Sequence, residues 1–204
     1  MDIINNFIDA LAQSFGIFGF AAVIFAETGL FFGFFLPGDS LLISAGIFAS
    51  NGTLNIWYLL PALIFASIAG DNTGFWIGRT YGDKFFKADA KILKKDYLDK
   101  AHEFFIKNGM LAIIFAKFIP AVRTFTPIVM GAAKIDPRKF LAYSIISGLI
   151  WAGGLTFLAY KISSYFDLKK YDNYIILGVI VLSLIPVIRE YLKAKKASTS
   201  KTTV

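Results

Sequence analysis

A run of 21 consecutive uncharged residues, Phe140–Tyr160, limits what this chain can fold into more than any other feature. As an α-helix at about 1.5 Å per residue, the run is about 32 Å long and matches the hydrocarbon core of a bilayer. Two further uncharged runs are Ser40–Gly70, with 31 residues, and Asn173–Ile188, with 16. Together these runs predict membrane-spanning helices at about 54–79, 139–161 and 173–193.

The composition supports this reading. Hydrophobic residues make up 56% of the chain and charged residues 17%, whereas soluble domains have about 25% charged residues. The chain has no Cys, which excludes a disulfide-stapled secreted domain. The high hydrophobicity excludes an intrinsically disordered chain. An integral membrane protein remains.

Two other apolar regions are interrupted and do not predict simple spanning helices. The region 15–50 contains Glu27 and the break Pro37-Gly38-Asp39, and the region 109–134 contains Lys117, Pro120, Arg123 and Pro127. Most of the limbs on either side of these breaks are about half a bilayer long, and only Phe15–Leu36 is long enough to span. Irregular backbone at membrane depth is tolerated where it is buried in protein or lines a wet cavity. The pattern therefore predicts two re-entrant hairpins.

Charged residues outside these regions predict the orientation. The stretch Asp83–Lys107 carries seven Lys and five acidic residues, and its apolar residues recur at helical spacing, which predicts an amphipathic helix on the membrane surface. A second short interfacial helix is expected at 2–14. The basic residues after Arg189 place the C-terminus in the cytoplasm. Counting back through the spanning helices, the two hairpins enter from opposite sides.

The predicted fold is therefore an all-α polytopic membrane protein. It has three spanning helices, two oppositely oriented re-entrant helical hairpins and interfacial amphipathic helices. Residues 1–193 form a single membrane domain, and residues 194–204 form a basic, disordered cytoplasmic tail.

Four charged residues at membrane depth are the main functional signal. The first hairpin supplies two acids and the second supplies two bases, and opposed hairpins bring them together near the midplane. A charge at bilayer depth costs about 2.5–3.5 kcal/mol on insertion scales, so such residues are functional candidates by default. The alternative is that they form two purely structural ion pairs. The four residues are Glu27, Asp39, Lys117 and Arg123.

Arginine usage points to Arg123. The chain has only four Arg against seventeen Lys, and an Arg within an apolar segment offers a planar fork that grips phosphate or carboxylate. Arg79 lies near a predicted helix end, where ordinary snorkelling explains it equally well. Asp71 is either a partner for a hairpin charge or a hydrogen-bonding residue between packed helices.

The order and spacing of these residues resemble the DedA family, whose members share the VTT domain. The resemblance extends over about residues 10–165. The motifs that carry it are Glu27…Pro37-Gly38-Asp39…Gly46, Gly70-Asp71…Gly78-Arg79…Gly82, His102…Phe105…Gly109, Phe118-Ile119-Pro120-Ala121-Val122-Arg123…Pro127…Gly131, and Trp151.

The resemblance implies a translocase in the bacterial cytoplasmic membrane. Its substrate would be undecaprenyl phosphate or a phospholipid such as phosphatidylethanolamine, with protons as the coupling ion. By the same resemblance, Glu27 and Asp39 are the proton-coupling acids, and Lys117 and Arg123 bind the phosphate headgroup. The family usually has Arg where this chain has Lys117. Lysine keeps the charge but cannot bind in the bidentate manner of Arg.

Asp71 and Arg79 are expected to support the site, together with the hairpin breakers Pro37, Gly38, Pro120 and Pro127. We expect no catalytic residue, no metal site, no cofactor, no enzymatic activity and no nucleic-acid partner; an oligomer is compatible with the sequence. Three alternatives stay open: a secondary transporter of a small soluble ion or solute, an intramembrane enzyme such as a lipid phosphatase, and a structural protein.

Overall fold

The computed structural model describes residues 8, 15–30, 37–85, 114 and 116–165, and its regular elements are all helical. In chain order these elements are α2 (Gly16–Gly29), α3 (Gly38–Ser50), α4 (Ile56–Phe85), α6 (Pro120–Ala132), α7 (Pro137–Gly148), the π-helical turn η2 (Leu149–Gly153) and α8 (Gly154–Tyr165).

Local sequence signals explain where several helices begin. Pro120 begins α6 and Pro137 begins α7, as suits a residue whose missing N–H would be unpaired in a first turn. Asp136 caps α7, because its carboxylate accepts hydrogen bonds from the backbone N–H of Arg138 at 2.7 Å and of Lys139 at 3.3 Å. The Asn55 side chain accepts one from the Trp57 backbone N–H at the start of α4.

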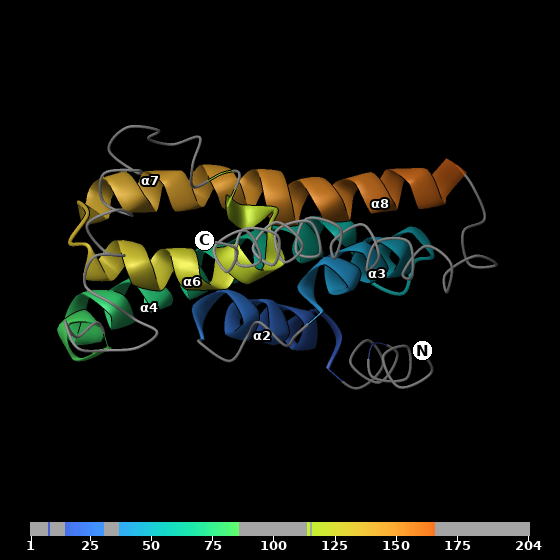
Figure 1. Ribbon diagram of the computed structural model, residues 1–204. Helices are drawn as coiled ribbons and strands as arrows, with labels where there is room; N and C mark the ends of the chain where they lie inside the picture. The colour runs from blue at the N-terminus through green and yellow to red at the C-terminus, as the bar shows by residue number, and fades with distance from the viewer. Residues whose placement is uncertain (1–7, 9–14, 31–36, 86–113, 115, 166–204) are drawn as a thin grey trace, which may run out of the picture.

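The long helix at the C-terminal end of the described chain is continuous. Elements α7, η2 and α8 follow one another from Pro137 to Tyr165 without a break (Figure 1). Of the helices that the structure describes, this is the one whose length and apolar composition suffice to cross a membrane. A helix predicted at 139–161 is therefore confirmed. The π-turn of η2 lies near its middle, a feature that is frequent at functional sites.

The helix predicted at 54–79 is also present, as α4, but it continues to Phe85. The polar residues Asp71 and Asn72 lie within it, and Pro61 is accommodated in its N-terminal part. The third predicted spanning helix at 173–193, the tail 194–204 and the limb of the second hairpin before residue 114 lie outside the described residues. So do the predicted interfacial helices, apart from residue 8 and residues 83–85.

Helices α2, α3 and α6 are short. They have 14, 13 and 13 residues, which at about 1.5 Å per residue makes each about 20 Å long. A helix needs about 20 residues to cross the hydrocarbon core. None of the three is long enough alone to do so.

Helix α4 is the centre of the packing, with α2 and α6 packed along it and α3 packed against α8 (Figure 1). Glycines allow the close approach of α4 and α6. A Cβ at Gly78 would overlap the backbone of Ile128, and one at Gly131 would overlap the backbone carbonyl of Phe75. Because the two backbones touch, α6 is held at a fixed depth along α4, which sets the position of the residues at its start.

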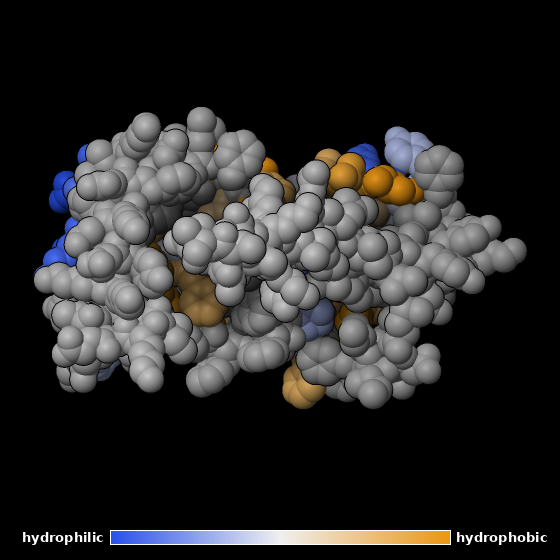
Figure 2. Space-filling model, viewed as in Figure 1, coloured by the Kyte–Doolittle hydropathy of each residue, from blue (hydrophilic) through white to orange (hydrophobic). Residues whose placement is uncertain are grey.

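The apolar core surrounds these contacts. One cluster lies between α2, α3, α4 and η2 and contains Phe20, Leu41, Leu59 and Trp151. A smaller one joins α4, α6 and α7, where the rings of Phe75 and Phe140 stack at 4.4 Å. On the surface, hydrophilic residues gather at the end where α7 begins and hydrophobic residues lie along α8 (Figure 2).

Candidate functional site

Arg123 joins three helices through a pair of carboxylates. It lies in the first turn of α6, and its Nη1 donates to Asp39 Oδ1 at 2.5 Å, while its Nη2 bonds to Glu27 Oε1. Glu27 is near the C-terminal end of α2, and Asp39 is in the first turn of α3. The prediction that Glu27 and Asp39 meet Arg123 is confirmed.

Lys117 has a different partner from the one expected. Its ammonium bonds to both carboxylate oxygens of Asp71, at 2.6 and 2.5 Å, rather than to an acid of the first hairpin. The prediction that the two bases share the two hairpin acids is therefore wrong for Lys117. The reason is that the fork of Arg123 occupies both hairpin acids, while α4 presents Asp71 to Lys117.

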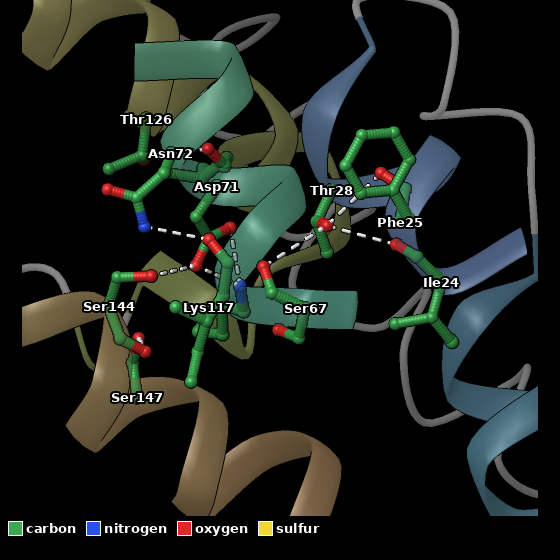
Figure 3. A network of polar contacts seen from close by, with 12 residues as sticks. Ile24, Phe25, Thr28, Ser67, Asp71, Asn72, Lys117, Thr126, Ser144 and Ser147 are labelled. Carbon is green, nitrogen blue, oxygen red and sulfur yellow. Dashed lines mark hydrogen bonds and ion pairs between the residues drawn. The ribbon is translucent and has the colours of Figure 1, made fainter. Parts of the chain in front are cut away.

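Asp71 fulfils both of its alternative roles. Besides binding Lys117, it accepts a hydrogen bond from Ser144 Oγ of α7 at 3.0 Å, so it joins α4, α7 and the segment before α6. Figure 3 shows Lys117 and Ser144 converging on this carboxylate. Nearby, Thr28 of α2 donates to the carbonyl of Ser67 in α4.

Trp151 connects the two ion-pair groups, although its place in the sequence predicts no role at the site. Its Nε1 donates to Asp39 Oδ1 at 2.9 Å. Its ring lies 4.7 Å from Arg123 Cζ and 5.3 Å from Lys117 Nζ, within the range of cation–π attraction. The feature of the sequence that could have pointed to Trp151 is that it is the one Trp in the uncharged run 140–160.

The five charged groups are nearly all withdrawn from solvent. Glu27 is 1% exposed, Asp71 3%, Lys117 4% and Arg123 5%, while the Asp39 side chain keeps 16% exposure. We call these five residues the charge cluster. It contains three carboxyl groups and two bases, so with every group ionised its net charge is −1.

Two atoms of the charge cluster have no hydrogen-bond partner in the described part of the chain. They are Glu27 Oε2 and Arg123 Nε, both buried. The Glu27 carboxyl also packs directly on the Gly38 backbone, where a Cβ would overlap it. Gly38 is thus required by close approach, and Pro37 precedes it at the N-cap position of α3.

The other predicted supporting residues have structural positions. Pro127 lies within α6 and packs toward Gly74 of α4, and Pro120 begins α6. Arg79 is not part of the charge cluster. Its Nη1 donates to the Ile135 carbonyl at 2.9 Å, and its guanidinium lies about 6 Å from the rings of Phe75 and Trp76.

The comparisons with known proteins identify the family. The sequence model of the VTT domain matches residues 36–161. Protein DedA of Escherichia coli K12 is 38% identical over 92% of this chain and 89% of its own length. The chain belongs to the DedA family of membrane proteins.

Other members of this family are similarly related. An uncharacterized membrane protein of Mycobacterium leprae is 38% identical over 80% of this chain and 74% of its own length. The inner membrane protein YghB of E. coli K12 is 30% identical over 80% of this chain and 75% of its own length. The VTT-domain match and these relatives confirm the resemblance found in the DedA motifs. No solved structure gives a significant match.

Proposed function

We propose that this DedA-family protein is a lipid translocase that moves a phosphate-bearing lipid across the bacterial cytoplasmic membrane. The observation that carries the proposal is the buried Arg123 fork, with Nη1 and Nη2 each on a different carboxylate. A guanidinium presented in this way can exchange two carboxylate oxygens for two phosphate oxygens without changing its own shape.

The carboxylates bind Arg123 and Lys117 until the lipid phosphate displaces them. Glu27 and Asp39 hold Arg123, and Asp71 holds Lys117, so neither base is left unpaired when no lipid is bound. Removing one member of a buried pair costs about 3–5 kcal/mol. Protonation of a hairpin acid weakens the hold on Arg123, which then binds the phosphate, and deprotonation returns Arg123 to the carboxylates and expels the headgroup.

The same acids couple the site to protons. Each elementary charge that moves across the membrane is worth about 2.3 kcal/mol per 100 mV. A proton carried with the lipid can therefore give the movement a direction.

The fold supports this proposal through its short helices. We place α2 and α3 in a first re-entrant hairpin, at about 15–50, and α6 in a second, at about 109–134. The half-bilayer lengths of the three helices suit hairpins whose tips meet inside the membrane. The proposal keeps spanning helices at 54–79, 139–161 and 173–193 and a cytoplasmic C-terminus.

Translocation in proteoliposomes tests the proposal. The full chain is reconstituted, and the transfer of a labelled phosphate-bearing lipid between leaflets is followed with an imposed proton gradient. Arg123→Gln and Glu27→Gln are expected to lose transport while remaining folded. Arg138→Gln is the matched control, because Arg138 is exposed at the start of α7. Full transport by both site variants would refute the mechanism.

The choice of substrate needs separate arms. Undecaprenyl phosphate and phosphatidylethanolamine are tested in parallel, since the shared phosphate chemistry admits both. Transport of a soluble anion without lipid transfer would instead support a secondary transporter. Release of inorganic phosphate from either lipid would support an intramembrane enzyme.

A further inference from the structure

The two carboxyl groups that hold Arg123 have unequal surroundings. Asp39 has Trp151 Nε1 as a second donor, and its side chain is 16% exposed. Glu27 is 1% exposed, receives its hydrogen bond from Arg123, and its Oε2 has no partner within the described residues. The departure of Arg123 therefore affects the two acids differently.

Trp151 is a donor that is independent of the charge state of the cluster. An indole N–H donates at every pH and cannot accept. The residue is fully buried in η2, so its ring has little freedom to turn away. When Arg123 leaves, Asp39 keeps this hydrogen bond.

Among the described residues, Glu27 has no comparable donor. The charged groups that face it are Arg123 of α6, Asp39 of α3 and Lys117 of the segment before α6, and Lys117 is bound by Asp71 of α4. Without Arg123, Glu27 is a buried carboxylate beside the carboxylate of Asp39. Groups in such surroundings become neutral rather than remain charged.

We propose that the two hairpin acids divide the work: Glu27 takes the coupling proton, while Trp151 holds Asp39 in place as an anion. This inference rests on the proposed function, in which Arg123 moves to a lipid phosphate. In the step, an O–H bond forms on the Glu27 carboxyl with a proton from water, and its hydrogen bond with Arg123 breaks. The proton returns to water when Arg123 comes back.

Trp151 is thus a positioning residue, and it also offers a way to observe the cluster without any lipid. The chain has three Trp, and the other two, Trp57 and Trp76, are 79% and 53% exposed. A Trp57→Phe/Trp76→Phe background leaves Trp151 as the sole indole. Because Lys117 Nζ and Arg123 Cζ lie over the Trp151 ring, the fluorescence emission of Trp151 should change when either cation moves.

The first experiment titrates this emission in detergent without lipid. The background protein should show one pH-dependent change, which Glu27→Gln abolishes and Asp39→Asn retains. A response lost in Asp39→Asn but kept in Glu27→Gln would overturn the proposal, as would no response in the background protein. Since no lipid is present, this outcome is separate from the success or failure of the translocase assay.

The second experiment measures translocation by Trp151→Phe, which keeps an aromatic ring but removes the N–H. A hydrogen bond to a charged group of this kind predicts a loss of about ten- to a hundredfold in rate. Without the indole N–H, Asp39 loses the donor that does not depend on Arg123, so the pH dependence of the rate should change. An unchanged pH dependence would overturn the positioning role, and Trp57→Phe serves as the control.

Discussion

Replacing Lys117 by Met tests its ion pair with Asp71, one of the two roles that the sequence left open for Asp71. Met keeps most of the length of the side chain but leaves Asp71 buried with Ser144 as its remaining hydrogen-bond donor. Both charged groups are at most 5% exposed, so solvent screens them little. The expected loss is about 3–5 kcal/mol in the free energy of unfolding. Asp71→Asn, which leaves the ammonium without its anion, should lose a similar amount.

The double variant makes the prediction specific. With both charges removed, Lys117→Met/Asp71→Asn should be destabilised by no more than either single variant, because no buried charge is left unpaired. Unfolding by SDS titration in mixed micelles measures all four proteins. A matched cycle of Lys117→Met with Arg138→Gln, at the exposed start of α7, should give additive losses to within about 0.5 kcal/mol. Additive losses for Lys117 and Asp71 would refute the assigned pairing.

Substitutions at four further positions test the packing and the helix start. Gly78→Ala should lower stability by about 1–3 kcal/mol, because its Cβ overlaps the α6 backbone, whereas Gly74→Ala meets its nearest atom at 3.3 Å and should cost less in the same SDS titration. Gly38→Ala should displace the Glu27 carboxyl from the charge cluster and reduce lipid translocation in a protein that still elutes as a single species. Asp136→Ala should fray the start of α7, seen as faster amide exchange there, while Asp136→Asn should not. Backbone hydrogen bonds from α7 lower the pKa of Asp136, so its stabilisation is present above its unfolded-state pKa and is lost as the pH falls through the lower folded value.

The long helices could be predicted because uncharged runs leave few alternatives. Phe140–Tyr160 has no charge to end a helix, and the structure extends it only to the capped start at Pro137 and to Tyr165. The end of α4 was harder to place. Asp83 and Lys84 were expected to belong to a surface segment, yet polar residues continue a helix without penalty once it leaves an apolar environment.

The charge cluster could be predicted in its members but not in its pairs. A charge within an apolar run is visible in sequence, and this was enough for Glu27, Asp39, Lys117 and Arg123. Which acid meets which base depends on how the helices rotate about their axes. The glycine contacts between α4 and α6 set that rotation, and no spacing along the chain reveals it.

Trp151 shows the remaining difficulty. A Trp in an apolar run is most often a packing residue, and here it is also fully buried in the core cluster. Its role depends on where its N–H points. That direction places the donor on Asp39, and only the three-dimensional structure shows it.

The central claim is that Arg123 recognises a lipid phosphate, and headgroup discrimination tests it most directly. Vesicles containing the full chain also carry two labelled lipids with the same tail, one with a phosphate headgroup and one without, and the transfer of both is measured together. We expect transfer of the phosphate-bearing lipid alone, lost in Arg123→Gln and retained in Arg138→Gln. Equal transfer of the two lipids, or full transfer by Arg123→Gln, would contradict it.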